Sequence, residues 1–127
     1  MDLAPGDYLI ISADDASIFS KCLKNNIKPI IGIDAYLALR KREDKQAGID
    51  NARYRLVLLA KNEVGYKNLM KLCTLGHTEG FYFKPRIDVE LLSKYSDGLV
   101  ATSACPGGVV GAHLVNNNYD EALAYAG

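Results

Sequence analysis

Short apolar runs alternate with helix-like segments along this chain, and that alternation constrains its fold more than any other feature. Each apolar run is short and rich in Ile, Leu and Val, as in buried strands. The predicted strands are residues 8–11, 27–38, 54–60 and 99–103. Between and after them, apolar residues recur every three or four positions, as for Ile18 with Cys22 and Leu69 with Cys73, which predicts helices. The predicted helices lie within residues 14–24, 63–75, 88–95, 109–115 and 119–126.

This order predicts an α/β fold of about four β-α units, with a parallel sheet or barrel and right-handed crossovers. Ligands of such folds bind beyond the carboxyl ends of the strands. Polar or turn-forming residues stand at three of these ends: 12–15, Asp34 and 103–108. Residues 39–52 are charged, contain Gly48 and have few apolar side chains, so we expect an exposed, flexible loop.

Composition excludes several classes of protein. Fifteen basic residues balance fifteen acidic ones, so no global field draws the chain to nucleic acid or to an anionic membrane. No segment reaches the roughly 20 apolar residues of a membrane span, and the first residues lack the features of a signal peptide. The chain is therefore predicted to be cytoplasmic and not bound to a membrane.

The three cysteines are an odd number without CxxC spacing, which argues against a disulfide framework and a zinc ribbon. A reducing compartment fits this pattern best. Cys22 and Cys73 lie on predicted helix faces and are expected to pack as small apolar side chains. Cys105 stands instead in the turn-like sequence Ser-Ala-Cys-Pro-Gly-Gly after the fourth strand.

Four stretches of the sequence resemble one family, in order and at the expected intervals. They are residues 27–36, 56–69, 79–88 and 98–108. Together they resemble the PHP domain of the bacterial DNA polymerase III alpha subunit, and the likeness extends from about Asp7 to the carboxyl end.

The resemblance implies a PHP-type (β/α)7 barrel, similar to a TIM barrel, with histidines and carboxylates around Zn or Mn ions at the strand ends. Several cations of this kind generate hydroxide and polarise phosphoryl oxygens, which allows phosphoester hydrolysis. Residues 1–127 would form an incomplete PHP domain, because the family's first strand, with its His-x-His pair, and its last barrel strands have no counterpart here. We therefore expect the metal site to be incomplete or empty.

The resemblance carries three residues of this chain to metal-ligand positions. Asp34 matches a carboxylate ligand, Cys105 matches a cysteine ligand, and Asp14 aligns loosely with the aspartate of a Thr-Asp-His motif. Two of them also have a simpler interpretation: Asp34 as a strand-end residue meeting solvent or a basic neighbour, and Cys105 as a small buried side chain. His77 and His113 lie outside the family's ligand positions and are expected to be surface or packing residues.

Arg55 occupies the position at which many family members place a metal-binding histidine. A guanidinium stays protonated and has no lone pair to offer a metal. Arg55 is therefore either an exposed strand residue or the partner of Asp34 in a salt bridge that replaces a metal ion. Val109 likewise replaces a glutamate that is common in the family.

The resulting hypothesis is a fragment of the PHP domain of a replicative DNA-directed DNA polymerase, a nucleotidyltransferase, with no catalytic residue in the fragment. The fragment would have a structural or partner-docking role. Through the parent chain the implied partners are DNA, a proofreading exonuclease and a sliding clamp. The alternatives are a stand-alone PHP-family phosphoesterase and a metal-free binding module. An incomplete barrel with uncovered apolar faces is also expected to be a marginal or aggregating monomer.

Overall fold

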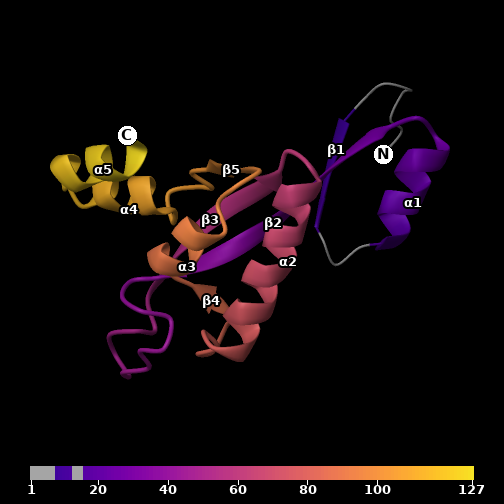
Figure 1. Ribbon diagram of the computed structural model, residues 1–127. Coiled ribbons are helices and arrows are strands. Elements are labelled where there is room, and N and C mark those ends of the chain that lie inside the picture. The colour runs from indigo at the N-terminus through magenta and orange to yellow at the C-terminus, as the bar shows by residue number, and fades with distance from the viewer. Residues whose placement is uncertain (1–7, 13–15) are drawn as a thin grey trace.

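The computed structural model describes residues 8–12 and 16–127 as a mixed β-sheet with five helices (Figure 1). The elements follow in the order β1 (Tyr8–Ser12), α1 (Ala16–Lys24), β2 (Lys28–Ala38), β3 (Arg53–Ala60), α2 (Glu63–Thr78), β4 (Arg86–Ile87), α3 (Val89–Lys94), β5 (Leu99–Thr102), α4 (Val109–Val115) and α5 (Tyr119–Ala126). The predicted α/β class is confirmed, and each predicted strand and helix has a counterpart. The two-residue strand β4 was not predicted, because a periodic pattern needs more residues than that.

The sheet has the order β1-β2-β3-β5, and β4 pairs with β2. β1 and β4 run parallel to β2, whereas β3 runs antiparallel to both β2 and β5. The prediction of a wholly parallel sheet was therefore wrong for β3. The connection differs from that of a β-α unit: residues 39–52 join β2 to β3 without a helix, whereas parallel neighbours are usually joined by a helical crossover.

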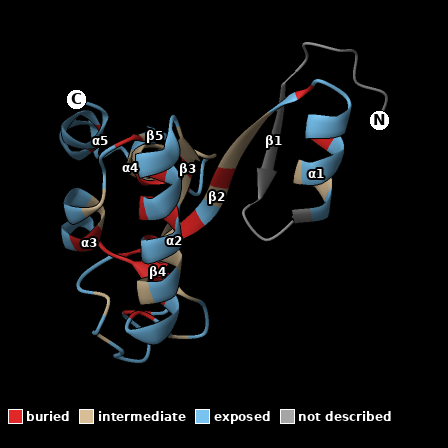
Figure 2. Ribbon diagram, turned by 45° about the vertical axis from the view of Figure 1, so that its right-hand side comes forward, coloured by how far each residue is buried: buried red, intermediate tan, exposed pale blue. Residues whose placement is uncertain are grey.

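Helix α2 covers one face of the sheet and builds the core against β2 and β3 (Figure 1). Leu69 and Leu72 of α2 have no exposed surface and pack with Leu58 of β3, which is 1% exposed. Figure 2 shows the buried residues concentrated where α2 meets β2 and β4. Ala35 and Leu37 of β2 point into this core, so the residues that alternate with them point to the other face.

A close contact between two glycines fixes the start of α2 against the turn before β5. A Cβ atom on Gly65 would lie 1.9 Å from the Gly98 carbonyl oxygen, and Gly98 has a φ of +72°. Asn62 caps the helix by accepting a hydrogen bond from the Gly65 N–H. Only glycine therefore fits at positions 65 and 98, where the start of α2 meets the turn before β5.

Candidate functional site

Asp34 on β2 and Arg55 on β3 form an ion pair on the sheet face opposite α2. In the antiparallel register Arg55 lies opposite Tyr36, which makes Asp34 its diagonal neighbour. The guanidinium donates to both carboxylate oxygens, with Nε 3.3 Å from Oδ1. The side chains of Arg55 and Asp34 are 50% and 42% exposed. Of the two alternatives left open for Arg55, the structure contains the ion pair.

Cys105 belongs to the same neighbourhood through the turn that precedes α4. The Arg55 N–H donates to the Gly107 carbonyl oxygen at 3.0 Å, and the Gly108 N–H donates to the Cys105 carbonyl oxygen at 2.7 Å. The pKa of the Arg55 guanidinium is raised, first by its hydrogen bond to Asp34 and then by the Asp34 charge, with a smaller contribution from Cys105. The fold therefore brings Asp34, Arg55 and Cys105 together. Asp14 lies outside the described residues.

The side chains around Arg55 do not fit a centre of several metal ions. Within residues 8–12 and 16–127 no three His, Cys, Asp or Glu side chains are grouped so that they could hold a metal ion. Asp34 already receives hydrogen bonds from Arg55 on both oxygens, and the other candidate ligand, Cys105, lies in the turn bonded to the Arg55 backbone. A guanidinium adds positive charge where a metal ion would need electron pairs.

An open pocket of about 400 Å³ lies between α2 and the edge of β2. It lies beside residues 33–35, which are paired with neither β1 nor β4. Cys73 and His77 line it from α2, and the Nδ1 atom of the exposed His77 lies 2.8 Å from the Cys73 carbonyl oxygen. Cys22 is 3% exposed, which confirms its predicted packing role, whereas Cys73 is only half-buried.

His113 packs between aromatic rings, as expected for a packing residue. Its ring centroid lies 5.5 Å from that of Tyr125 and 5.7 Å from that of Tyr54. Its Nδ1 atom lies 3.1 Å from a carboxylate oxygen of Glu121. His113 thus joins α4 to both β3 and α5.

Sequence reasoning missed Arg86, one of the most extensively hydrogen-bonded side chains among the residues that the structure describes. It is 1% exposed and donates to four backbone carbonyl oxygens, those of Arg42, Asp44, Asp50 and Gly80. These acceptors belong to residues 39–52 and to the turn after α2, so one guanidinium ties both segments to β4. The sequence offered one signal of this role: Arg86 stands between Pro85 and Ile87, two residues before the helix cap Asp88.

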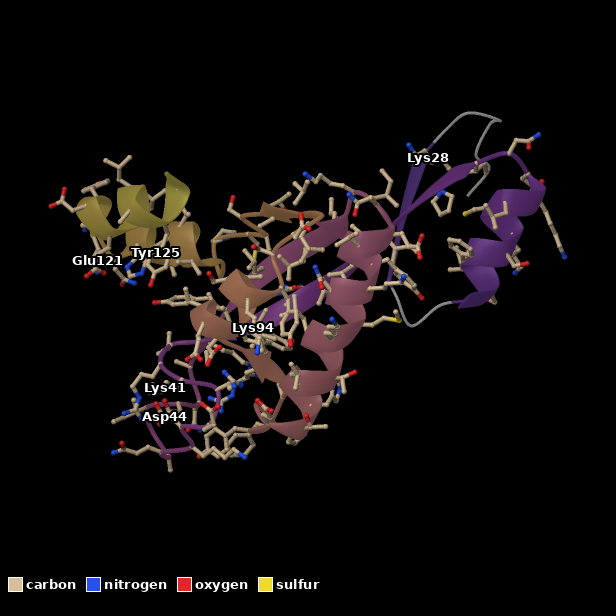
Figure 3. All side chains as sticks on the ribbon, in the orientation of Figure 1. Lys28, Lys41, Asp44, Lys94, Glu121 and Tyr125 are labelled. Atoms are coloured by element: carbon tan, nitrogen blue, oxygen red, sulfur yellow. The ribbon has the colours of Figure 1, made fainter. Side chains whose placement is uncertain are left out.

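The loop of residues 39–52 is mostly exposed and is tethered by charged side chains. Asp88, which caps α3, accepts hydrogen bonds from the Arg42 N–H and guanidinium, and Arg40 pairs with the buried Asp50. Figure 3 shows Lys41 and Asp44 on this loop, at the opposite side of the view from Lys28 at the start of β2. The loop is therefore fixed at several points.

Within the described residues no helix is long and apolar enough to cross a membrane.

The PHP domain model matches residues 12–127 of the chain. The DNA polymerase III subunit alpha of Borreliella burgdorferi is 49% identical over 105 residues, which cover 82% of this chain and 9% of that protein. The subunit of the same name from Aquifex aeolicus is 50% identical over 98 residues, covering 72% of this chain and 8% of that protein. The one from Thermus aquaticus is 36% identical over 131 residues, covering 97% of this chain and 11% of that protein.

The chain thus spans between 8% and 11% of the length of these relatives. The match to the family model, over residues 12–127, includes Asp34, Arg55, Cys105 and Arg86. On these grounds the chain belongs to the PHP domain family and is homologous to the PHP region of DNA polymerase III alpha subunits.

Proposed function

We propose that this chain is part of a DNA polymerase III alpha subunit, a replicative DNA-directed DNA polymerase. Residues 1–127 would be an incomplete PHP domain with a structural or partner-docking role. The similarity to three alpha subunits over most of the chain supports the parent protein. Polymerisation itself would be carried out by parts of the parent protein other than these residues.

The ion pair of Asp34 with Arg55 is the observation that carries the structural role. A PHP centre needs several lone-pair donors around its cations. Here the Asp34 carboxylate is bound by the Arg55 guanidinium, so one of the two candidate donors, Asp34 and Cys105, is already engaged. Asp14 would add a single carboxylate. We propose that Asp34, Cys105 and Asp14 are the remains of a metal site in which Arg55 supplies the positive charge.

The partners of the parent protein belong to the same proposal. Through the rest of the polymerase the chain would work with DNA, a sliding clamp and a proofreading exonuclease, in the cytoplasm. The name and sequence of the relatives support DNA as a partner. The sliding clamp, the exonuclease and the cytoplasmic location follow only from the resemblance to the family. Within the chain, the docking role would fall to surfaces other than the engaged Asp34–Arg55 pair.

Substituting Arg55 by histidine tests the degenerate metal site. Arg55→His removes the competing cation and adds a third donor beside Asp34 and Cys105, so we expect it to create a Co²⁺ site. Its signature is a thiolate-to-cobalt charge-transfer absorption that disappears in Arg55→His/Cys105→Ser. Arg53→His is the matched control, because Arg53 lies two residues away on the same strand face and its guanidinium packs over Tyr36.

Two results would contradict the proposal. Stoichiometric Co²⁺ binding by the unsubstituted chain, lost in Cys105→Ser, would mean that the site is intact. No Co²⁺ binding by Arg55→His would mean that Asp34 and Cys105 do not form a site. Hydrolysis of p-nitrophenyl phosphate by the unsubstituted chain would favour a phosphoesterase, and the reading frame on both sides of the gene segment tests the polymerase parent directly.

A further inference from the structure

A cysteine and a histidine one turn apart on α2 line the same pocket. Cys73 and His77 are four residues apart, so their side chains lie on one face of the helix, one above the other. Both line the open pocket of about 400 Å³ between α2 and the edge of β2. Cys73 is half-buried and His77 is exposed. A thiol and an imidazole therefore meet one space that a small ion can enter from solvent.

The imidazole of His77 is held by the helix backbone. Its Nδ1 atom lies 2.8 Å from the Cys73 carbonyl oxygen, and because a carbonyl oxygen only accepts, Nδ1 carries the hydrogen. Nε2 is then the ring nitrogen with a lone pair. Histidines that bind metal ions commonly donate their other ring N–H to a backbone carbonyl group, which fixes the tautomer and the ring orientation. His77 thus has the supporting hydrogen bond of a metal ligand, and its acceptor belongs to the residue that supplies the thiol.

The number of donors around this pair determines which ion fits. Among the described residues no group of three His, Cys, Asp or Glu side chains could hold a metal ion. Asp34 also lines the pocket, but both of its carboxylate oxygens accept hydrogen bonds from Arg55. Zn²⁺ in a closed protein site takes about four ligands. A soft monovalent ion such as Cu⁺ is satisfied by two ligands in a nearly linear arrangement, and it prefers thiolate and accepts imidazole.

Charge favours the same kind of ion. A thiolate, a neutral imidazole and Cu⁺ together carry no net charge, whereas a divalent ion would leave one positive charge. The pocket also has apolar walls, formed by Ile33, Leu72, Pro85 and Ile87, and an uncompensated charge beside apolar side chains is costly. The pair lies near the end of α2 at Thr78, and the carboxyl end of a helix favours a bound cation.

We propose that Cys73 and His77 form a binding site for a soft monovalent metal ion such as Cu⁺. The Cys73 thiolate and the Nε2 atom of His77 are its two ligands, and the thiol proton is released to solvent on binding. The site uses neither Cys105 nor the carboxylate of Asp34. It therefore does not depend on the degenerate metal site proposed above.

Anaerobic titration of the reduced chain with Cu⁺, in competition with bicinchoninate, tests this site. We expect one Cu⁺ per chain to be retained, with one sulfur and one nitrogen neighbour in its X-ray absorption spectrum. Cys73→Ser should lose this ion, and His77→Gln should weaken its binding by about tenfold or more. His77→Cys places a second soft thiolate at the same spacing, so it should bind Cu⁺ at least as tightly as the unsubstituted chain.

Two variants are matched controls. Cys105→Ser removes the other half-buried cysteine, which has no histidine four positions along the chain, so this variant should keep the ion. His77→Gln/Thr78→His moves the imidazole to the next residue, which is also exposed and lies about 100° further around the helix axis. This variant should not recover the binding lost in His77→Gln.

The proposal is overturned if the unsubstituted chain yields all of its Cu⁺ to bicinchoninate, or if Cys73→Ser keeps the ion. It is overturned as well if Cys105→Ser loses the ion, or if His77→Gln/Thr78→His binds it as tightly as the unsubstituted chain. Co²⁺ prefers more ligands and should be held less tightly than Cu⁺, so Cys73→Ser also gives the background for the cobalt titration of Arg55→His.

Discussion

Arg86 shows how one buried charge organises this chain at the scale of a single residue. Its guanidinium donates hydrogen bonds to the carbonyl oxygens of Arg42, Asp44, Asp50 and Gly80. Removing the donor takes a partner from four carbonyl groups at hydrogen bonds that are buried for two of them and partly buried for the other two, and each unsatisfied buried group is costly. Arg86→Met, which keeps the apolar stem, is therefore expected to lower the free energy of unfolding by about 3 kcal/mol. Urea unfolding followed by circular dichroism measures the loss.

Lys84→Met provides the comparison, because Lys84 is two residues away, exposed and without an ion pair among the described residues. It should change the free energy of unfolding by less than about 0.5 kcal/mol. Equal urea midpoints for Arg86→Met and the unsubstituted chain would show that residues 39–52 and 79–85 are held by other contacts.

At the scale of an element, the connection between β2 and β3 depends on two ionised carboxylates. Burial would raise the pKa of Asp88, but hydrogen bonds from the Arg42 and Leu91 N–H groups and the charge of Arg42 outweigh it and lower that pKa. The hydrogen bond from Arg40 lowers the pKa of Asp50. A lowered pKa in the folded state stabilises it above the unfolded value of about 3.9, and this stabilisation disappears as the pH falls through the folded value.

We therefore expect the melting temperature to fall as the pH drops below about 4. Asp88→Asn keeps a cap acceptor for the Leu91 N–H but removes the charge, so it should lower the melting temperature at neutral pH and flatten its dependence on acid pH. Asp97→Asn, at an exposed aspartate, should leave the profile unchanged. Identical profiles for Asp88→Asn and the unsubstituted chain would refute the role of this carboxylate.

At the scale of the whole molecule, α4 and α5 carry a large exposed apolar surface. Val115 is 71% exposed, Leu123 is 72% exposed and Tyr119 is 63% exposed. Strongly exposed apolar side chains on two neighbouring helices favour association. We predict concentration-dependent self-association in sedimentation velocity, and a marked reduction in the double variant Val115→Lys/Leu123→Lys.

Leu23→Lys is the control, because Leu23 is 56% exposed but lies on α1, which Figure 2 places at the other end of the molecule. It should leave association unchanged. A chain that stays monomeric at high concentration would argue against an adhesive α4–α5 surface, and an equal effect of Leu23→Lys would place the contact elsewhere.

The sequence alone determined the local parts of this protein. The positions of the longer strands and helices followed from apolar periodicity, and the Asp88 cap followed from a carboxylate placed before an apolar run, because both depend on residues within a few positions of each other. The resemblance also predicted that Asp34 and Cys105 occupy metal-ligand positions and that Arg55 replaces a metal-binding histidine. The family was predicted correctly from four short stretches.

Tertiary structure decided what depends on residues far apart in the chain. The direction of β3 followed from the loop that returns the chain, and the choice between an exposed Arg55 and one bound to Asp34 followed from the register of two strands. The role of Arg86 followed from carbonyl groups up to 44 residues away, which offer the same acceptor whatever their side chains. The periodicity of apolar residues shows which face of a single helix or strand packs in the core. Strand pairing and hydrogen bonds to distant backbone groups join residues far apart in the chain, so they leave no local sequence pattern.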